Sequence, residues 1–144
     1  MNFGLFGAGL VMGIAAIGSG LGIGYAGQAT IGAWKKCYIA NKPAPMMLLA
    51  FAGAPLTQTF YGFILMGQMI QAAGAAPEKG WLYVGYGLAS GFAMAFSAIV
   101  QGKVGAAAAD AQAETGKGFA QYIAVVGITE TVALFAMVLT MISF

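Results

Sequence analysis

The sequence has few charged residues, and it has no arginine and no histidine. Only 7% of its 144 residues are charged, 60% are hydrophobic, and Cys37 is the single cysteine. Soluble domains have about a quarter charged residues, so we expect nearly all of this chain to lie in or near lipid. Without histidine, and with one cysteine, a transition-metal site lacks its ligands. A net charge of +2 provides no basic patch for nucleic acid.

Four long apolar segments are present instead, and they predict an all-α membrane protein with four transmembrane helices. Each is longer than the roughly 20 residues needed to cross the hydrocarbon core. They run from Phe3 to Trp34, Pro45 to Ala73, Trp81 to Ala113 and Gly118 to Phe144. The breaks "KKCYIANKPAP", "GAAPEKG" and "DAQAETGKG" contain charges and turn formers. The N-terminal "MNFGLFGAGLVMG" lacks the basic start of a secretory signal, so we expect it to remain as the first membrane helix.

Three lysines in the first break predict the orientation of the chain. Lys35, Lys36 and Lys42 lie there, and the positive-inside rule places such a loop in the cytoplasm. The loop between helices three and four is then also cytoplasmic, and both termini lie outside a cell membrane that the chain crosses several times. Cys37 falls in this predicted loop, and we interpret it as an incidental free thiol.

The two halves of the sequence are related. "SGLGIGYAGQA" from Ser19 aligns with "SAIVQGKVGAA" from Ser97, an offset of 78 residues, and "LTQTFYGF" from Leu56 aligns with "ITETVALF" from Ile128, an offset of 72. This predicts two tandem duplicated helical hairpins, residues 1–73 and 81–144, joined by an outer loop at residues 74–80. Gln58 in the first hairpin then takes the place that Glu130 takes in the second.

Glycine is concentrated in the first apolar segment, and the third is similar but less so. "GAGLVMG" and "GSGLGIG" imitate nucleotide-binding loops, but those loops need a preceding strand and a soluble α/β unit. Small residues at helical spacing instead let membrane helices approach closely. We therefore expect segments one and three to form a tightly packed inner wall. The larger residues of segments two and four suit an outer wall against lipid.

Glu130 is the one acidic residue at the centre of an apolar segment, where an ionised carboxylate is costly and usually functional. Other polar side chains lie at similar depth, namely Thr57, Gln58, Thr59, Tyr61, Ser97, Gln101, Thr129 and Thr131. Ala54, Thr57, Gln58 and Tyr61 share one helix face by their i, i+3, i+4, i+7 spacing, and Pro55 leaves the Phe51 carbonyl without its helical donor. These residues offer an all-oxygen set: a carboxylate, two amide oxygens, a hydroxyl and a loosened carbonyl. Such a set suits a hard cation such as Na⁺. A strong Ca²⁺ site would need several carboxylates, and this set has one.

The motifs "PLTQTFYGF", "IVQGKVGAAAA" and "GITETVALF" resemble the proteolipid rotor subunit of V-type ATPases (the K or c type) in its four-helix duplicated form, over essentially the whole chain. The sodium-transporting members are the most similar. The resemblance implies a Na⁺ site made by Glu130, Gln101, Thr57, Gln58 and the Ala54 carbonyl, with Tyr61 hydrogen-bonding the carboxylate. Leu56 departs from the family, in which glycine is common at that position.

The resemblance also implies a mechanism and partners. Identical subunits form a rotor ring in the bilayer, and each copy carries one ion at Glu130. A stator subunit (the a or I type) releases the ion with an essential arginine, and a central stalk meets the cytoplasmic loops. The chain is then a non-catalytic subunit and not itself an enzyme.

Three alternatives stay open from the sequence. The same rotor could carry H⁺ in place of Na⁺, with Gln58 and Tyr61 only hydrogen-bonding the carboxyl. A four-helix exporter of small cations could place Glu130 in a dimer pocket, although its neighbours Thr129, Thr131 and Val132 are not aromatic. A purely structural proteolipid would leave Glu130 without an explanation.

Overall fold

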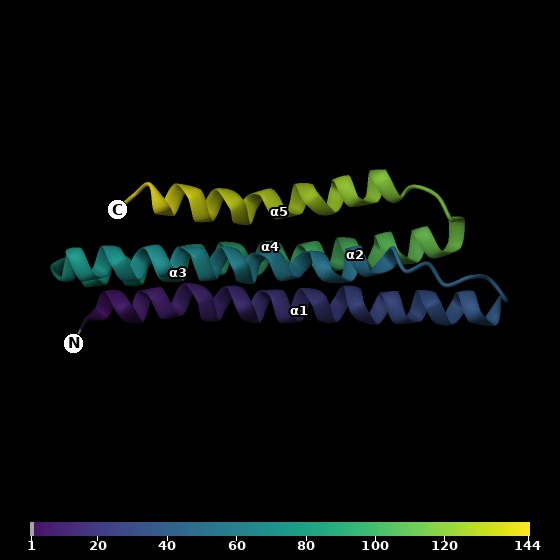
Figure 1. Ribbon diagram of the computed structural model, residues 1–144, viewed down its shortest axis with the longest axis horizontal. Helices are drawn as coiled ribbons and strands as arrows, with labels where there is room; N and C mark the ends of the chain where they lie inside the picture. The colour runs from purple at the N-terminus through teal and green to yellow at the C-terminus, as the bar shows by residue number, and fades with distance from the viewer. Residues whose placement is uncertain (1) are drawn as a thin grey trace.

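The computed structural model describes residues 2–144, and within them every regular element is helical. Four helices are long and apolar enough to cross a membrane, which confirms the predicted class. They run side by side along the long axis of the molecule (Figure 1). In chain order the elements are α1 (Phe3–Ile39), α2 (Leu48–Gly53), η1 (Ala54–Leu56), α3 (Thr57–Ala75), η2 (Pro77–Lys79), α4 (Gly80–Thr115) and α5 (Phe119–Met141).

The connections alternate between the two ends of the bundle. The α1–α2 and α4–α5 loops lie at one end, and both termini lie at the other, together with the α3–α4 connection (Figure 1). The ends of the helices have recognisable stop and start signals. Asn2 caps α1 by accepting a hydrogen bond from the Gly4 amide at 3.0 Å. Gly116 and Gly118 both have positive φ, a conformation that glycine adopts without strain, and so they turn the chain from α4 into α5.

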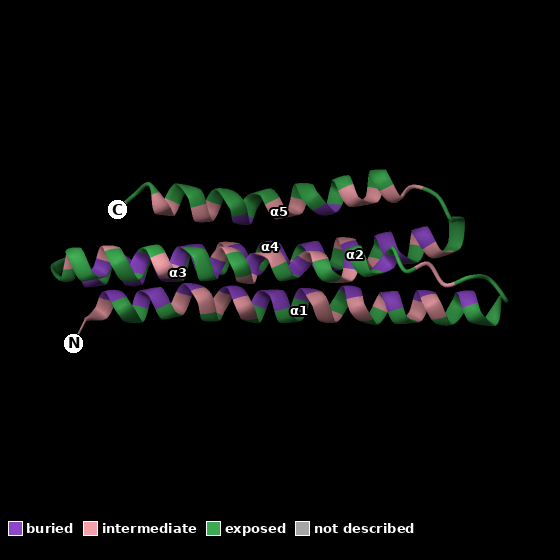
Figure 2. Ribbon diagram, in the orientation of Figure 1, coloured by how far each residue is buried: buried purple, intermediate pink, exposed green. Residues whose placement is uncertain are grey.

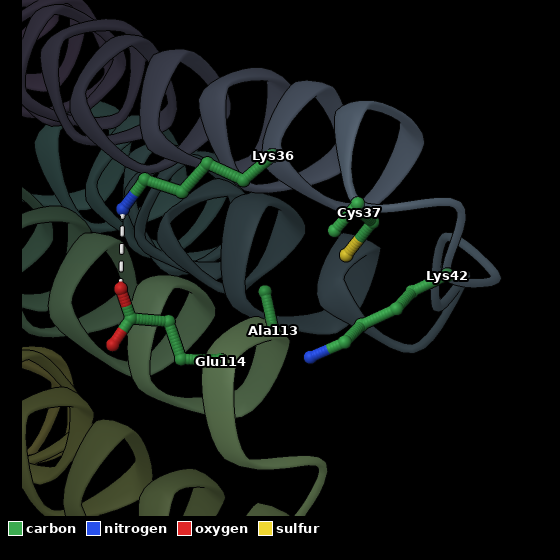
Figure 3. A pocket seen from close by; sticks show the side chains of 6 residues that line it. Lys36, Cys37, Lys42, Ala113 and Glu114 are labelled. Carbon is green, nitrogen blue, oxygen red and sulfur yellow. Dashed lines mark hydrogen bonds and ion pairs between the residues drawn. The ribbon is translucent and has the colours of Figure 1, made fainter.

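The predicted first break begins too early, because α1 continues through Lys35 and Lys36 to Ile39. Cys37 is therefore a buried residue of the last helical turns and not a loop residue. The Lys36 ammonium pairs with Asp110 at 2.7 Å and with Glu114 at 3.4 Å on α4, so the charges that signalled a loop instead join two helix ends. Figure 3 shows Lys36 turned toward Glu114, with Cys37 nearby. The third break begins too early in the same way, since α4 continues to Thr115.

The two glycine-rich helices, α1 and α4, make the most extensive contact in the chain. Glycine lies opposite glycine in this contact: a Cβ added to Gly87 would overlap the backbone of Gly7, and one added to Gly102 would overlap the backbone of Gly22. The tight packing expected of these helices is confirmed. α5 lies against α4 and α3, on the side away from α1, and is the least buried of the four (Figure 2), which leaves a broad apolar surface suited to lipid.

Pro55 interrupts the second membrane segment, as expected. The 3₁₀ turn η1 contains it and separates α2 from α3. Pro55 is buried and lies so close to α1 that a Cβ on Gly22 would be 2.8 Å from it. The Phe51 carbonyl oxygen lies against α4, where a Cβ on Gly105 would be 2.7 Å from it. The carbonyl that the proline loosens therefore faces α4, and the turn places Ala54 and Thr57 beside the polar residues described next.

Candidate ion-binding site

Glu130 lies on α5, where its carboxylate receives hydrogen bonds from two other helices. The Tyr61 hydroxyl on α3 donates to Oε1, and the Gln101 amide on α4 donates to Oε2 at 3.2 Å. Glu130 is partly buried, so the carboxylate is near the outer surface of the bundle. One carboxylate thus joins three membrane segments within a single chain.

Gln101 is fully buried and uses both ends of its amide. Besides Glu130, its Nε2 donates to the Val126 carbonyl at 3.0 Å. Its Oε1 accepts a hydrogen bond from Gln58 Nε2 at 2.9 Å. Gln58 is also fully buried, and neutral amides of this kind are tolerated in an apolar interior because each polar atom finds a partner.

Three oxygens gather at the η1 turn. The Thr57 hydroxyl is 2.9 Å from the Ala54 carbonyl and 3.2 Å from Gln58 Oε1. Ala54 and Thr57 are three residues apart at the 3₁₀ turn around Pro55, which places the carbonyl and the hydroxyl together. The structure therefore brings together all six residues that the sequence proposed: Ala54, Thr57, Gln58, Tyr61, Gln101 and Glu130.

Ser97 belongs to the same network, although the sequence indicated only that it lies at similar depth. Its buried hydroxyl accepts a hydrogen bond from Gln58 Nε2 at 3.3 Å and donates to the Thr129 carbonyl at 2.7 Å. Ser97 precedes Gln101 by four residues, so both lie on one face of α4. That spacing could have revealed Ser97, but no sequence signal identifies the Val126 carbonyl.

Of the other polar residues near this depth, Thr131 and Lys103 lie outside the network, and Thr129 borders it. Thr131 is exposed and its hydroxyl donates to its own helix at Ile128. The Thr129 hydroxyl donates to Val126 in the same way. Lys103 lies 5.5 Å from the centre of the Tyr25 ring, a cation–π contact made with α1. The network is therefore smaller than the full set of polar residues.

Two comparisons with known proteins bear on what this chain is. Residues 84–143, which include most of α4 and all of α5, match the family model that describes the C subunit of ATP synthase. The chain is also 31% identical, over 140 residues and 96% of its length, to the A-type ATP synthase subunit K of Methanocaldococcus jannaschii. Both findings support a proteolipid subunit of an A/V-type ATP synthase. It spans 60% of the length of that relative.

The match to the family model includes Ser97, Gln101 and Glu130 but not Thr57, Gln58 or Tyr61. The first hairpin lies outside the matched residues and supplies Ala54, Thr57, Gln58 and Tyr61 to the network. Joining the two hairpins in one chain makes the network complete without a second copy.

The charge of Glu130 has no basic partner in the network. Among residues 2–144, the side-chain ion pairs within 4.0 Å both involve Lys36 at the far end of α1. A carboxylate among apolar helices is costly unless a charge neutralises it. The neighbouring groups are neutral oxygens and amides, which are ligands for a hard cation or partners for a protonated carboxyl. The arrangement can therefore hold one monovalent cation or one proton.

Proposed function

We propose that this chain is a rotor-ring subunit of an A/V-type ATPase and that it carries one Na⁺ across the membrane at Glu130. The observation that carries the proposal is a lone carboxylate, without a basic partner, joined to a network of buried neutral oxygens. Similarity to the C subunit of ATP synthase and to an A-type ATP synthase subunit K supports the rotor part. In this role the chain is non-catalytic, and ATP is hydrolysed elsewhere in the complex.

Five oxygens would hold the ion: a carboxylate oxygen of Glu130, the amide oxygens of Gln58 and Gln101, the Thr57 hydroxyl and the Ala54 carbonyl. Gln58 Oε1 already lies 3.2 Å from the Thr57 hydroxyl. Gln101 instead turns its amide nitrogen toward Glu130. To bind the ion through its oxygen, the Gln101 side-chain amide would rotate by half a turn, which exchanges the positions of its nitrogen and oxygen. Tyr61 would remain as the donor that holds the carboxylate in place.

Ion loading would allow the ring to rotate through lipid. A bare carboxylate facing the hydrocarbon is expensive, whereas the pair of Na⁺ and Glu130 is neutral. The partly buried position of Glu130 on the outermost helix suits such a passage. An arginine of a stator subunit would displace the ion when Glu130 arrives, and a central stalk would transmit the torque.

Each chain would carry one ion for four helices, because Gln58 takes the place of Glu130 in the first hairpin. Fewer ions per turn let ATP hydrolysis work against a steeper gradient, which favours a pump over a synthase. The α1–α2 loop, which follows Lys35 and Lys36 and contains Lys42, shares one end of the bundle with the α4–α5 loop (Figure 1). We propose that this end lies in the cytoplasm of a cell-membrane complex and meets the stalk there, with both termini outside.

Carbodiimide labelling of the purified ring tests the proposal. The reagent attacks a protonated carboxyl, so Na⁺ bound at Glu130 should protect it, and K⁺ at equal ionic strength should not. The rate of labelling would be measured over a range of pH and Na⁺ concentration, with the Glu130→Gln variant as the unlabelled control. Labelling of Glu130 that ignores Na⁺ would contradict the sodium site and support a rotor that carries protons.

A further inference from the structure

Among residues 2–144, two buried hydroxyls of α1 find no hydrogen-bond partner. They belong to Ser19, which is 2% exposed, and to Thr30, which is 1% exposed. Buried polar groups in folded proteins are hydrogen-bonded almost without exception, so an unpartnered one calls for an explanation. Thr30 lies about three turns further along α1, roughly 16 Å at 1.5 Å per residue. The two hydroxyls therefore lie at different depths in the bundle.

The neighbours of Ser19 on α1 show what its hydroxyl faces. Ala15 and Gly22 share its side of the helix, four residues before it and three after it. Both lie against the second membrane segment. A Cβ added to Gly62 of α3 would be 2.8 Å from the Ala15 Cβ, and a Cβ added to Gly22 would be 2.8 Å from the Pro55 Cβ. Ser19 therefore faces the second segment between the levels of Pro55 and Gly62.

Gln58 occupies that interval on the second segment. It follows Pro55 by three residues and precedes Gly62 by four, so the three residues share one side of the segment. Gln58 is fully buried. The Ser19 hydroxyl thus lies beside the Gln58 side chain without a hydrogen bond to it. With Ser19 on α1, all four membrane segments border the network around Glu130.

The internal duplication supports this placement. The offset of 78 residues aligns Ser19 with Ser97, and the offset of 72 aligns Thr57 with Thr129. The Ser97 hydroxyl donates to the Thr129 carbonyl at 2.7 Å, but Ser19 makes no corresponding bond to the Thr57 carbonyl. Both hairpins contain the serine at this depth, and only the first leaves its hydroxyl free for another partner.

The proposed ion site creates a donor that needs such a partner. The two N–H groups of Gln58 Nε2 donate to Ser97 Oγ at 3.3 Å and to Gln101 Oε1 at 2.9 Å. When Gln101 turns its oxygen toward Na⁺, its nitrogen replaces Oε1 at the second contact, and one N–H of Gln58 loses its acceptor. A buried donor without an acceptor is costly. The Ser19 hydroxyl offers a free acceptor at the depth of Gln58.

We propose that Ser19 is a positioning residue of the ion site: its hydroxyl accepts the Gln58 N–H that Gln101 releases when Na⁺ binds. This rests on the proposed function, because Na⁺ is what turns Gln101. Without Na⁺, or with a proton on the carboxyl, Gln101 keeps its present orientation and the Ser19 hydroxyl stays unpartnered. Ser19 therefore stabilises the Na⁺-loaded state alone and favours Na⁺ over H⁺ at the same carboxylate.

Ser19→Ala separates this role from a role in packing. The Na⁺ concentration that halves carbodiimide labelling of Glu130 should rise roughly three- to tenfold, the effect of one net hydrogen bond. The rate of labelling without Na⁺ should match that of wild type. The unfolding temperature of the ring without Na⁺ should not fall, because the variant removes an unpartnered buried hydroxyl. The rise in unfolding temperature on addition of Na⁺ should become smaller.

Thr30→Val is the matched control. It removes the other unpartnered hydroxyl of α1 and keeps the size of the side chain, but at a depth away from Gln58. The Na⁺ concentration for half-protection of Glu130 should stay at the wild-type value. An increase equal to that of Ser19→Ala would overturn the proposed role of Ser19, since any change in the packing of α1 would then suffice.

A double-mutant cycle tests the route through Gln58. Gln58→Leu removes the amide whose N–H the Ser19 hydroxyl would accept, and it should weaken Na⁺ protection by itself. In that background Ser19→Ala should cause no further loss, because residues that act through one contact are not additive. Losses that add in the double variant would overturn the proposed contact between Ser19 and Gln58.

The outcomes separate the role of Ser19 from the proposed function. A wild-type ring that Na⁺ protects, with a Ser19→Ala variant protected at the same Na⁺ concentration, would overturn the role of Ser19 and leave the sodium site standing. Labelling of the wild-type ring that ignores Na⁺ would overturn the sodium site, and the role of Ser19 with it.

Discussion

The side chains of Gln58 and Gln101 meet in the interior through a hydrogen bond of 2.9 Å from Nε2 of the first to Oε1 of the second, although they are 43 residues apart in the chain. Both are fully buried. This contact joins the η1 turn on one side to Glu130 on the other, since Gln58 lies beside Thr57 and Gln101 donates to the carboxylate. It therefore couples the two hairpins at the depth of the carboxylate.

Replacement of Gln101 tests this coupling. Gln101→Leu should weaken Na⁺ protection of Glu130 by tenfold or more, because it removes one proposed ligand and leaves one N–H of the buried Gln58 amide without its acceptor. Each unsatisfied buried group costs about 1–3 kcal/mol. The measurement is the Na⁺ concentration that halves carbodiimide labelling, with the native mass of the ring recorded in parallel. A variant that fails to assemble would instead support a structural role for Gln101.

Neutralisation of the carboxylate should abolish transport and leave assembly unchanged. Glu130→Gln removes the charge that would bind Na⁺ while keeping the size of the side chain. ATP-driven uptake of radioactive Na⁺ into vesicles that contain the whole complex should fall to background. Glu114→Gln, an exposed change at the end of α4, is the matched control and should keep its uptake. Persistent uptake by Glu130→Gln would contradict the proposed site.

Tyr61 should hold the carboxylate in position without binding the ion. Tyr61→Phe removes the hydroxyl that donates to Glu130 and should weaken Na⁺ binding about tenfold, since one net hydrogen bond is worth roughly 1 kcal/mol and more when one partner is charged. Isothermal titration of Na⁺ into the ring measures the change. Tyr86→Phe loses only an exposed hydrogen bond to Ser143 and should bind Na⁺ normally. Equal effects of the two substitutions would argue against a special role for Tyr61.

Ser97 should act through Gln58. Its hydroxyl accepts from Gln58 Nε2, which helps to keep Gln58 Oε1 turned toward Thr57. Ser97→Ala should raise the Na⁺ concentration needed for half-protection of Glu130 several-fold, while the maximal rate of labelling without Na⁺ stays the same. Ser90→Ala is the control. Ser90 is also on α4, but its hydroxyl lies 2.6 Å from the Thr140 hydroxyl of α5, away from Gln58. A shift shared by both variants would indicate a general effect of packing.

The α1–α4 contact should not tolerate even one methyl group at its centre. A Cβ on Gly102 would overlap the Gly22 backbone, so Gly102→Ala must separate the helices, at a cost on the order of 1–3 kcal/mol. The temperature at which the purified protein loses tertiary structure should fall accordingly. Gly127→Ala places a methyl group in open space on α5 and should have little effect. A Gly102→Ala variant as stable as wild type would contradict the close approach.

The sequence predicts the four membrane segments, because long apolar runs and polar breaks follow directly from what a bilayer excludes. Its loop boundaries were less accurate. Lys36 signalled the end of a helix, but its ion pairs with Asp110 and Glu114 lie between the extended ends of α1 and α4. Such a pairing depends on two segments that are far apart in the chain, which local patterns do not contain.

The sequence by itself determined that Glu130 needs a compensating partner and that Thr57, Gln58 and Tyr61 share one helix face, because helical periodicity orders residues within a helix. Only the tertiary structure decided that this face meets Gln101 and Glu130, that Ser97 joins them, and that the Ser19 hydroxyl of α1 has no partner. Periodicity identifies which residues point the same way along one helix. Which helix lies opposite a given face depends on how all four helices pack. The close glycine contacts between α1 and α4 decide this packing.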